Sequence, residues 1–190
     1  MEKLSRLFRE IIPVILGILI ALVINNWNEN RKERKYLEKI NASIKSELEE
    51  SVADIKRVIP KQLASVDTIE VYLDNDKLSM YELMFKADGV HAPSIKTNSW
   101  NALANSRIEL IDYEKLTSLA DIEDWKENLA NRSEKQTDFL FYNMEETDRV
   151  KKEIYRMIIL DIIGSEQRLL SSIEELLADE FSGDKIIVKK

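Results

Sequence analysis

The side chains that most often carry out catalysis or bind metals are scarce in this chain of 190 residues. Cysteine is absent and histidine occurs once, so a cysteine nucleophile and a multi-histidine metal site are excluded. The one histidine, His91, stands beside Pro93 in a predicted loop, where we expect a solvated imidazole rather than a catalytic base. Four glycines in all are too few for the turns that hold phosphates. The sequence therefore predicts no enzyme, no cofactor and no metal.

One group of polar and aromatic residues stands out in the middle of the chain. It consists of Trp100, Asn101, Asn105 and Arg107. Two interpretations remain open for this group. It lines a ligand cleft at the end of a helical bundle, or it forms a packed corner where short helices meet.

Asp161 is the most unusual of the many acidic residues, because it interrupts the apolar run 158–163. A carboxylate in such a run either faces water or pairs with a cation. The sequence offers Arg107 and Arg168 as partners and does not choose between pairing and exposure.

An apolar segment near the N-terminus determines where in the cell the residues described above lie. Positions 11–24 contain fourteen residues without a charge, which as a helix would measure about 21 Å, short of a hydrocarbon core of about 30 Å. Residues suited to a membrane interface flank it on both sides: Lys3, Arg6, Arg9 and Trp27. We therefore predict a short basic tail over 1–10 and a transmembrane helix over 11–28. A signal peptide is disfavoured because no small-residue cleavage site follows, and a soluble helix buried in an oligomer is the remaining alternative.

The orientation of this helix follows from its flanking charges. Five basic residues follow the span and three precede it, which by count alone places the C-terminal part in the cytoplasm. The opposite orientation avoids moving three cations across the membrane against its potential. We predict a single-pass protein of the inner (cytoplasmic) membrane with the C-terminal domain on the extracytoplasmic side.

One face of the predicted span carries small and polar residues at four-residue spacing: Gly17, Ala21 and Asn25. A small-x-x-x-small pair allows a second helix to approach closely, and an asparagine can hydrogen-bond across the interface. Such pairs also arise by chance in apolar helices. The pattern predicts self-association or binding to another membrane protein, in addition to the lipid bilayer.

Two stretches resemble a known family. Residues 17–29 read GILIALVINNWNE and residues 98–111 read NSWNALANSRIELI. Both are similar to the recurring segments of a family of small, uncharacterised single-pass membrane proteins of Bacteroidetes-type bacteria. Val23 departs from the glutamine usual in that family, so a polar group inside the span is not implied. The resemblance implies an anchored helical protein and supplies no activity.

Charge is distributed unevenly along the chain. Residues 1–39 contain 8 Lys/Arg against 5 Asp/Glu, and residues 40–190 contain 20 against 30. The basic part suits anionic lipid headgroups. The acidic part argues against nucleic acid as a partner, because phosphate binding requires a basic face.

The rest of the chain shows helical periodicity and few breaks. Apolar residues recur every three or four positions, which predicts a juxtamembrane helix over 29–60, ended or kinked by Pro60. Ser79 followed by Glu82 predicts a capping box, and Asp112 predicts the start of a long helix. That helix continues past 131–133 or turns there. We expect an all-α antiparallel bundle of about four main helices over 61–184, followed by a tail over 185–190.

These features predict a membrane-anchored helical interaction or scaffold protein without catalysis. The alternative is a ligand-sensing helical bundle that signals through a membrane partner, since only about ten residues precede the span. The alternative would require a pocket near Trp100.

Overall fold

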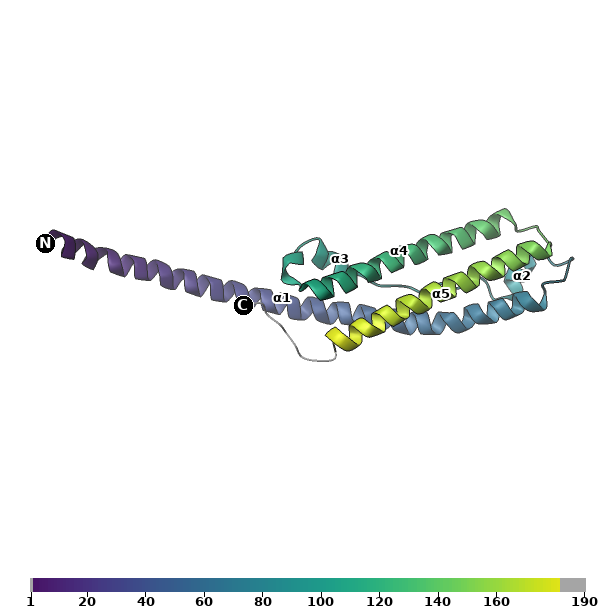
Figure 1. The fold of residues 1–190 in the computed structure, drawn as a ribbon, viewed down its shortest axis with the longest axis horizontal. Helices are drawn as coiled ribbons and strands as arrows, with labels where there is room; N and C mark the ends of the chain where they lie inside the picture. Colours follow the sequence, from purple (N-terminus) through teal and green to yellow (C-terminus); the bar gives the residue numbers. More distant parts are fainter. Residues whose placement is uncertain (1, 182–190) are drawn as a thin grey trace. The chain divides into compact units, whose positions relative to one another are not determined.

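The structure is a computed structural model that describes the backbone of residues 2–181 and the side chains of 11–179 and 181. All regular secondary structure in this range is helical (Figure 1). The elements are α1 (Glu2–Val71), α2 (Met80–Lys86), α3 (Asn98–Ala104), the 3-10 turn η1 (Ile108–Leu110), α4 (Tyr113–Tyr142) and α5 (Arg149–Glu180). The expected all-α class with a long apolar N-terminal helix is confirmed, and the expected tail over 185–190 lies outside the described residues.

The chain divides into two compact units. The first contains the part of α1 up to Ala42, and the second begins at Ser43 and contains the remaining helices. In the second unit the C-terminal part of α1, α4 and α5 run alongside one another as a bundle (Figure 1). The second of the four main helices expected from sequence is thus the end of α1.

Helix α1 continues through Pro60, so of the two predicted outcomes, an end or a kink at this residue, the end is wrong. A helical proline lacks an N–H and crowds the carbonyl four residues before it, at a cost of about 3 kcal/mol. The apolar stripe nevertheless continues on both sides, with Ile55 and Val58 before Pro60 and Ile69 after it all buried. Each such burial stabilises the helix by about 1.5–3 kcal/mol, so packing outweighs the local preference.

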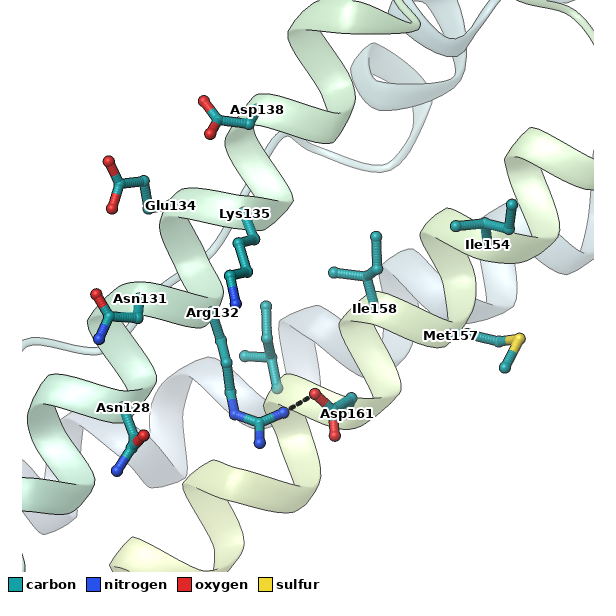
Figure 2. Close-up of a pocket in the computed structure, with 11 residues that line it drawn as sticks. Asn128, Asn131, Arg132, Glu134, Lys135, Asp138, Ile154, Met157, Ile158 and Asp161 are labelled. Atoms are coloured by element: carbon teal, nitrogen blue, oxygen red, sulfur yellow. Dashed lines mark hydrogen bonds and ion pairs between the residues drawn. The ribbon is translucent and has the colours of Figure 1, made fainter.

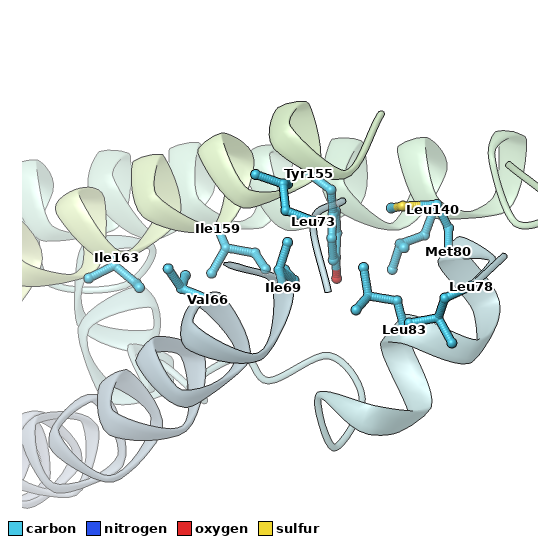
Figure 3. Close-up of a cluster of buried hydrophobic side chains, with 10 residues drawn as sticks. All are labelled: Val66, Ile69, Leu73, Leu78, Met80, Leu83, Leu140, Tyr155, Ile159 and Ile163. Carbon is cyan, nitrogen blue, oxygen red and sulfur yellow. The ribbon is translucent and has the colours of Figure 1, made fainter. Parts of the chain in front are cut away.

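The end of the bundle is closed by a buried cluster to which several elements contribute (Figure 3). Its members are Val66, Ile69 and Leu73 of α1, Leu78, Met80 and Leu83 in and before α2, Leu140 of α4, and Tyr155, Ile159 and Ile163 of α5. Helix α2 starts with the predicted capping box, in which Ser79 accepts from the Glu82 N–H and Glu82 accepts from the Ser79 N–H. The short helix therefore covers the end of the core.

Helix α4 starts at the predicted cap, where Asp112 accepts from the Lys115 N–H at 2.9 Å. It does not turn at 131–133 and ends instead at Tyr142. The carbonyls of the turn that follows are used by α2, because the N–H groups of Met80 and Tyr81 donate to Glu146 and Met144 at 2.8 and 3.0 Å. Pairing the turn with the free N-terminal donors of α2 fixes the position of the turn.

Candidate interaction surfaces

The apolar segment of α1 is exposed along its whole length in the isolated chain. Its large side chains between Ile11 and Ile24 are 43–67% exposed. Within the described residues, α1 is the one helix that is long and apolar enough to cross a membrane, and none of its apolar window is buried. Exposing an apolar surface of this size to water is unfavourable, so we expect it to contact a non-aqueous environment such as lipid or protein.

The small residues on this segment leave space beside the helix. A Cβ added at Gly17 would meet no atom within 4 Å. The Asn25 amide donates to Glu29 Oε1 at 3.1 Å, so one of its two N–H bonds is used within its own helix. With Ala21 between them, Gly17 and Asn25 present a smooth face to any helix that packs there.

Residues at the ends of the segment have the character of a membrane interface. Trp27 is exposed, and the Arg31 guanidinium lies 5.9 Å from the centroid of its ring. An aromatic ring with a cation beside it is a combination typical of membrane interfaces. The side chains of Lys3, Arg6 and Arg9 lie outside the described part of the chain.

The structure places the four residues of the Trp100 group in different environments. Trp100 is buried, whereas Asn105 is exposed and donates to the Asn101 carbonyl at 2.8 Å. Asn101 reaches Thr97 Oγ1 at 3.5 Å, and Arg107 binds Glu109 at 3.0 Å. This geometry is that of a packed corner, with a core tryptophan and local polar contacts.

The corner is held to α1 by contacts that sequence reasoning missed. Glu47 accepts from both the N–H and the hydroxyl of Ser99 at 2.9 Å, so it satisfies a free donor at the start of α3. One and two turns along, Ser51 accepts from the Lys96 N–H at 2.9 Å and Asp54 from the Ser94 N–H at 2.7 Å. The segment before α3 is therefore fastened along one face of α1.

An open groove of about 940 Å³ runs between α4 and α5 (Figure 2). Helix α5 contributes apolar side chains: Ile154, Met157, Ile158 and Ile162. Helix α4 contributes mainly polar and charged ones: Asn128, Asn131, Arg132, Glu134, Lys135 and Asp138. Met157 is 59% exposed, so part of this apolar surface faces water.

Asp161 pairs across this groove with Arg132, an arginine that the sequence did not suggest (Figure 2). Of the two suggested partners, Arg107 binds Glu109 and Arg168 lies over the Trp125 ring at 5.6 Å. Asp161 remains half exposed, so this pair contributes at most about 1 kcal/mol. The helical period could not show that Arg132 and Asp161 meet, because they belong to different helices.

A second, smaller groove of about 430 Å³ lies near the start of α4 and the end of α5. Four carboxylates line it: Glu114, Asp121, Glu175 and Asp179. A phosphate chain would be repelled by this surface.

Several polar groups are buried between the helices. The Gln62 amide lies between Glu166 of α5 and the carbonyl of His91, at 2.8 and 2.9 Å. The His91 side chain is only 16% exposed, with Nε2 3.6 Å from Asp88, so the expectation of a solvated imidazole is wrong. Its segment is drawn onto α1 by the Gln62 contact, which lies 29 residues away in the sequence.

Comparison of the chain with protein-family models, curated proteins and solved structures found no match. The family resemblance of the two stretches therefore stays a prediction, and the functional argument rests on the surfaces described above.

Proposed function

We propose that this protein is a membrane-anchored helical interaction or scaffold module without catalysis of its own. The observation that carries the proposal is the charge-free, exposed segment of α1 between Ile11 and Ile24. In water this surface would drive aggregation, whereas in a bilayer each apolar side chain is solvated by lipid. The basic residues that follow Trp27 would lie among anionic headgroups.

We place the protein in the inner membrane with residues after the span on the extracytoplasmic side. The support is the cost of moving the three basic residues of the N-terminal tail across the membrane. A reporter fused after Lys190 tests this orientation. Activity of a reporter that works only outside the cytoplasm is expected, and activity confined to a cytoplasmic reporter would overturn the orientation.

We further propose that the groove between α4 and α5 binds a second copy of the chain. The groove has both signs of charge, with Arg132 and Lys135 near Glu134 and Asp138, so two copies related by a two-fold axis can place cations against anions. Copies anchored in one bilayer also meet at a raised effective concentration. In such a dimer the partly exposed side chains of Ile154 and Met157 would be buried against the second copy.

The natural absence of cysteine allows a direct test, because an introduced thiol has no competitor in the chain. We expect Met157→Cys, oxidised in native membranes, to give a disulfide-linked dimer. Val71→Cys is the matched control, since Val71 is 76% exposed and lies outside the groove. Cross-linking of Met157→Cys to a different protein would show that the groove binds a heterologous partner. If both variants remain monomeric, the groove does not bind a second copy of the chain.

The alternative of a ligand-sensing bundle has less support. Trp100 is buried, and Asn101 and Asn105 hydrogen-bond to protein groups, so the region that would form the sensor pocket is packed. An interaction role requires no such pocket.

A further inference from the structure

Glu166 is a carboxyl group fully enclosed in the second unit. It lies near the middle of α5 with no exposed surface, and it contacts Gln62 of α1, which is also buried. Gln62 Nε2 donates to Glu166 Oε1 at 2.8 Å. The other oxygen of each group, Gln62 Oε1 and Glu166 Oε2, is buried without a partner. Two adjacent acceptors without a donor are a costly arrangement in a core.

One proton would supply the donor that the two unpaired oxygens, Gln62 Oε1 and Glu166 Oε2, lack. On Glu166 Oε2 it converts an unpaired acceptor into a donor, and Gln62 Oε1 is an acceptor on the side chain already bonded to Glu166. An amide and a carboxylic acid have the donors and acceptors for two complementary hydrogen bonds, of which the structure contains the one from Gln62 Nε2. An ionised carboxylate at the same place would be an unpaired charge in the core.

Gln62 also holds a turn of the chain onto the bundle. Its Nε2 donates to the His91 carbonyl at 2.9 Å, and one turn along α1 Ser65 donates to the Ala87 carbonyl at 2.9 Å. Between these two anchor points, Asp88 and Gly89 adopt left-handed conformations with φ of 62° and 83°. The 87–91 turn is therefore tied to α1 through two side chains, one of which depends on Glu166.

We propose that Glu166 binds a proton in the folded protein, and that the protonated acid and Gln62 form a latch whose deprotonation loosens the 87–91 turn. The proton comes from and returns to solvent, so the step needs no other reactant. The latch is independent of the membrane and association roles proposed above.

The charged groups on the neighbouring elements are engaged in other contacts. In the turn, His91 pairs with Asp88. On α4, Lys126 binds Glu123 and Arg132 binds Asp161. On α5, Arg168 lies over Trp125. On α1, Lys61 is exposed.

Burial is the dominant influence on this acid. It raises the pKa of Glu166 to about 7, and the hydrogen bond from Gln62 opposes the rise. Protonation therefore changes near neutral pH, where a change of one unit alters the charged fraction substantially.

Hydrogen exchange of the full chain in detergent micelles tests the latch. The Gly89 N–H, which donates to the Met84 carbonyl at 3.0 Å, reports on the turn. After correction for the intrinsic pH dependence of exchange, we expect its protection to fall about tenfold between pH 6 and pH 8 in the unmodified chain. Glu166→Gln, which keeps a donor and an acceptor at all pH values, should show constant protection.

His91 lies in the same turn and requires a control of its own. His91→Asn should retain the pH response, because only the backbone carbonyl of His91 takes part in the latch. Loss of the response in His91→Asn, or its persistence in Glu166→Gln, would overturn the proposal. So would a carboxyl carbon NMR titration that places the Glu166 midpoint below pH 5.

Discussion

Lys152 shows how one buried polar side chain can fix the end of a long helix. Its ammonium group has no exposed surface and donates to the carbonyls of Asn75 and Tyr72 at 2.5 and 3.4 Å. These carbonyls lie just past the last turn of α1, where a cation is favourable, and each also accepts one backbone N–H, from Leu78 and Asn75 respectively. Burial lowers the pKa of Lys152, and Asp76, Asp148 and Asp74 oppose that shift.

Replacing Lys152 with methionine should therefore destabilise the second unit. The substitution keeps the volume but removes the ammonium donor that the Tyr72 and Asn75 carbonyls share, so each carbonyl keeps only its backbone N–H partner. We expect a loss of about 1–3 kcal/mol in the free energy of unfolding. The change is measured as a lower urea midpoint in micelles. Lys77→Met is the control, because Lys77 is exposed in the turn after α1. An equal effect of both substitutions would contradict a capping role for Lys152.

Glu166 predicts a pH dependence of stability with a definite sign. Burial raises the pKa of Glu166 from its ordinary value of 4.5 to about 7 in the folded chain, so the folded state binds more protons between these values. Stability from this group is full below about pH 4.5 and is lost as pH rises to about 7, by about 3 kcal/mol in total. The unfolding free energy of Glu166→Gln minus that of the unmodified chain should therefore increase from pH 5 to pH 8. A constant difference would mean that Glu166 does not titrate in this range.

At the level of elements, α1 retains a proline that its own helix disfavours. Pro60 is exposed, so its ring contributes little to the core. Pro60→Ala should raise the free energy of unfolding by about 1–3 kcal/mol, because it restores a backbone hydrogen bond and removes a steric clash. Lys61→Ala, at the next exposed position, should have an effect within about 0.5 kcal/mol. If Pro60→Ala does not raise the free energy of unfolding, the proline does not destabilise α1 in its present conformation.

The elements also show what the sequence could predict. The caps at Ser79 and Asp112 and the helical class followed from local rules, because each depends on residues three or four positions apart. The sequence left open whether α1 ends or only kinks at Pro60, because tertiary packing decides the outcome. The Glu47–Ser99 and Gln62–Glu166 contacts span 52 and 104 residues, and helical periodicity does not show which faces meet. The groove between α4 and α5 was missed for the same reason.

At the level of the whole molecule, the small-residue face of the span predicts how copies meet within the membrane. Gly17→Leu combined with Ala21→Leu should weaken self-association in a membrane reporter several-fold, because the larger side chains separate the helices. The space around Gly17 means that the substitution strains nothing within one chain. Val14→Leu with Ile18→Leu, which keeps the rest of the span unchanged, is the control. Unchanged association in Gly17→Leu, Ala21→Leu would exclude this face.

Membrane anchoring by the exposed apolar segment is the claim on which the proposed function depends. Extraction of native membranes with alkaline carbonate tests it directly, since the treatment releases peripheral proteins and leaves spanning proteins in the pellet. We expect the unmodified chain and a Leu16→Ala, Ile20→Ala control to remain in the pellet. Leu16→Lys with Ile20→Lys should move to the supernatant, because each central lysine costs about 2.5–3.5 kcal/mol on insertion. Release of the unmodified chain into the supernatant would contradict the account.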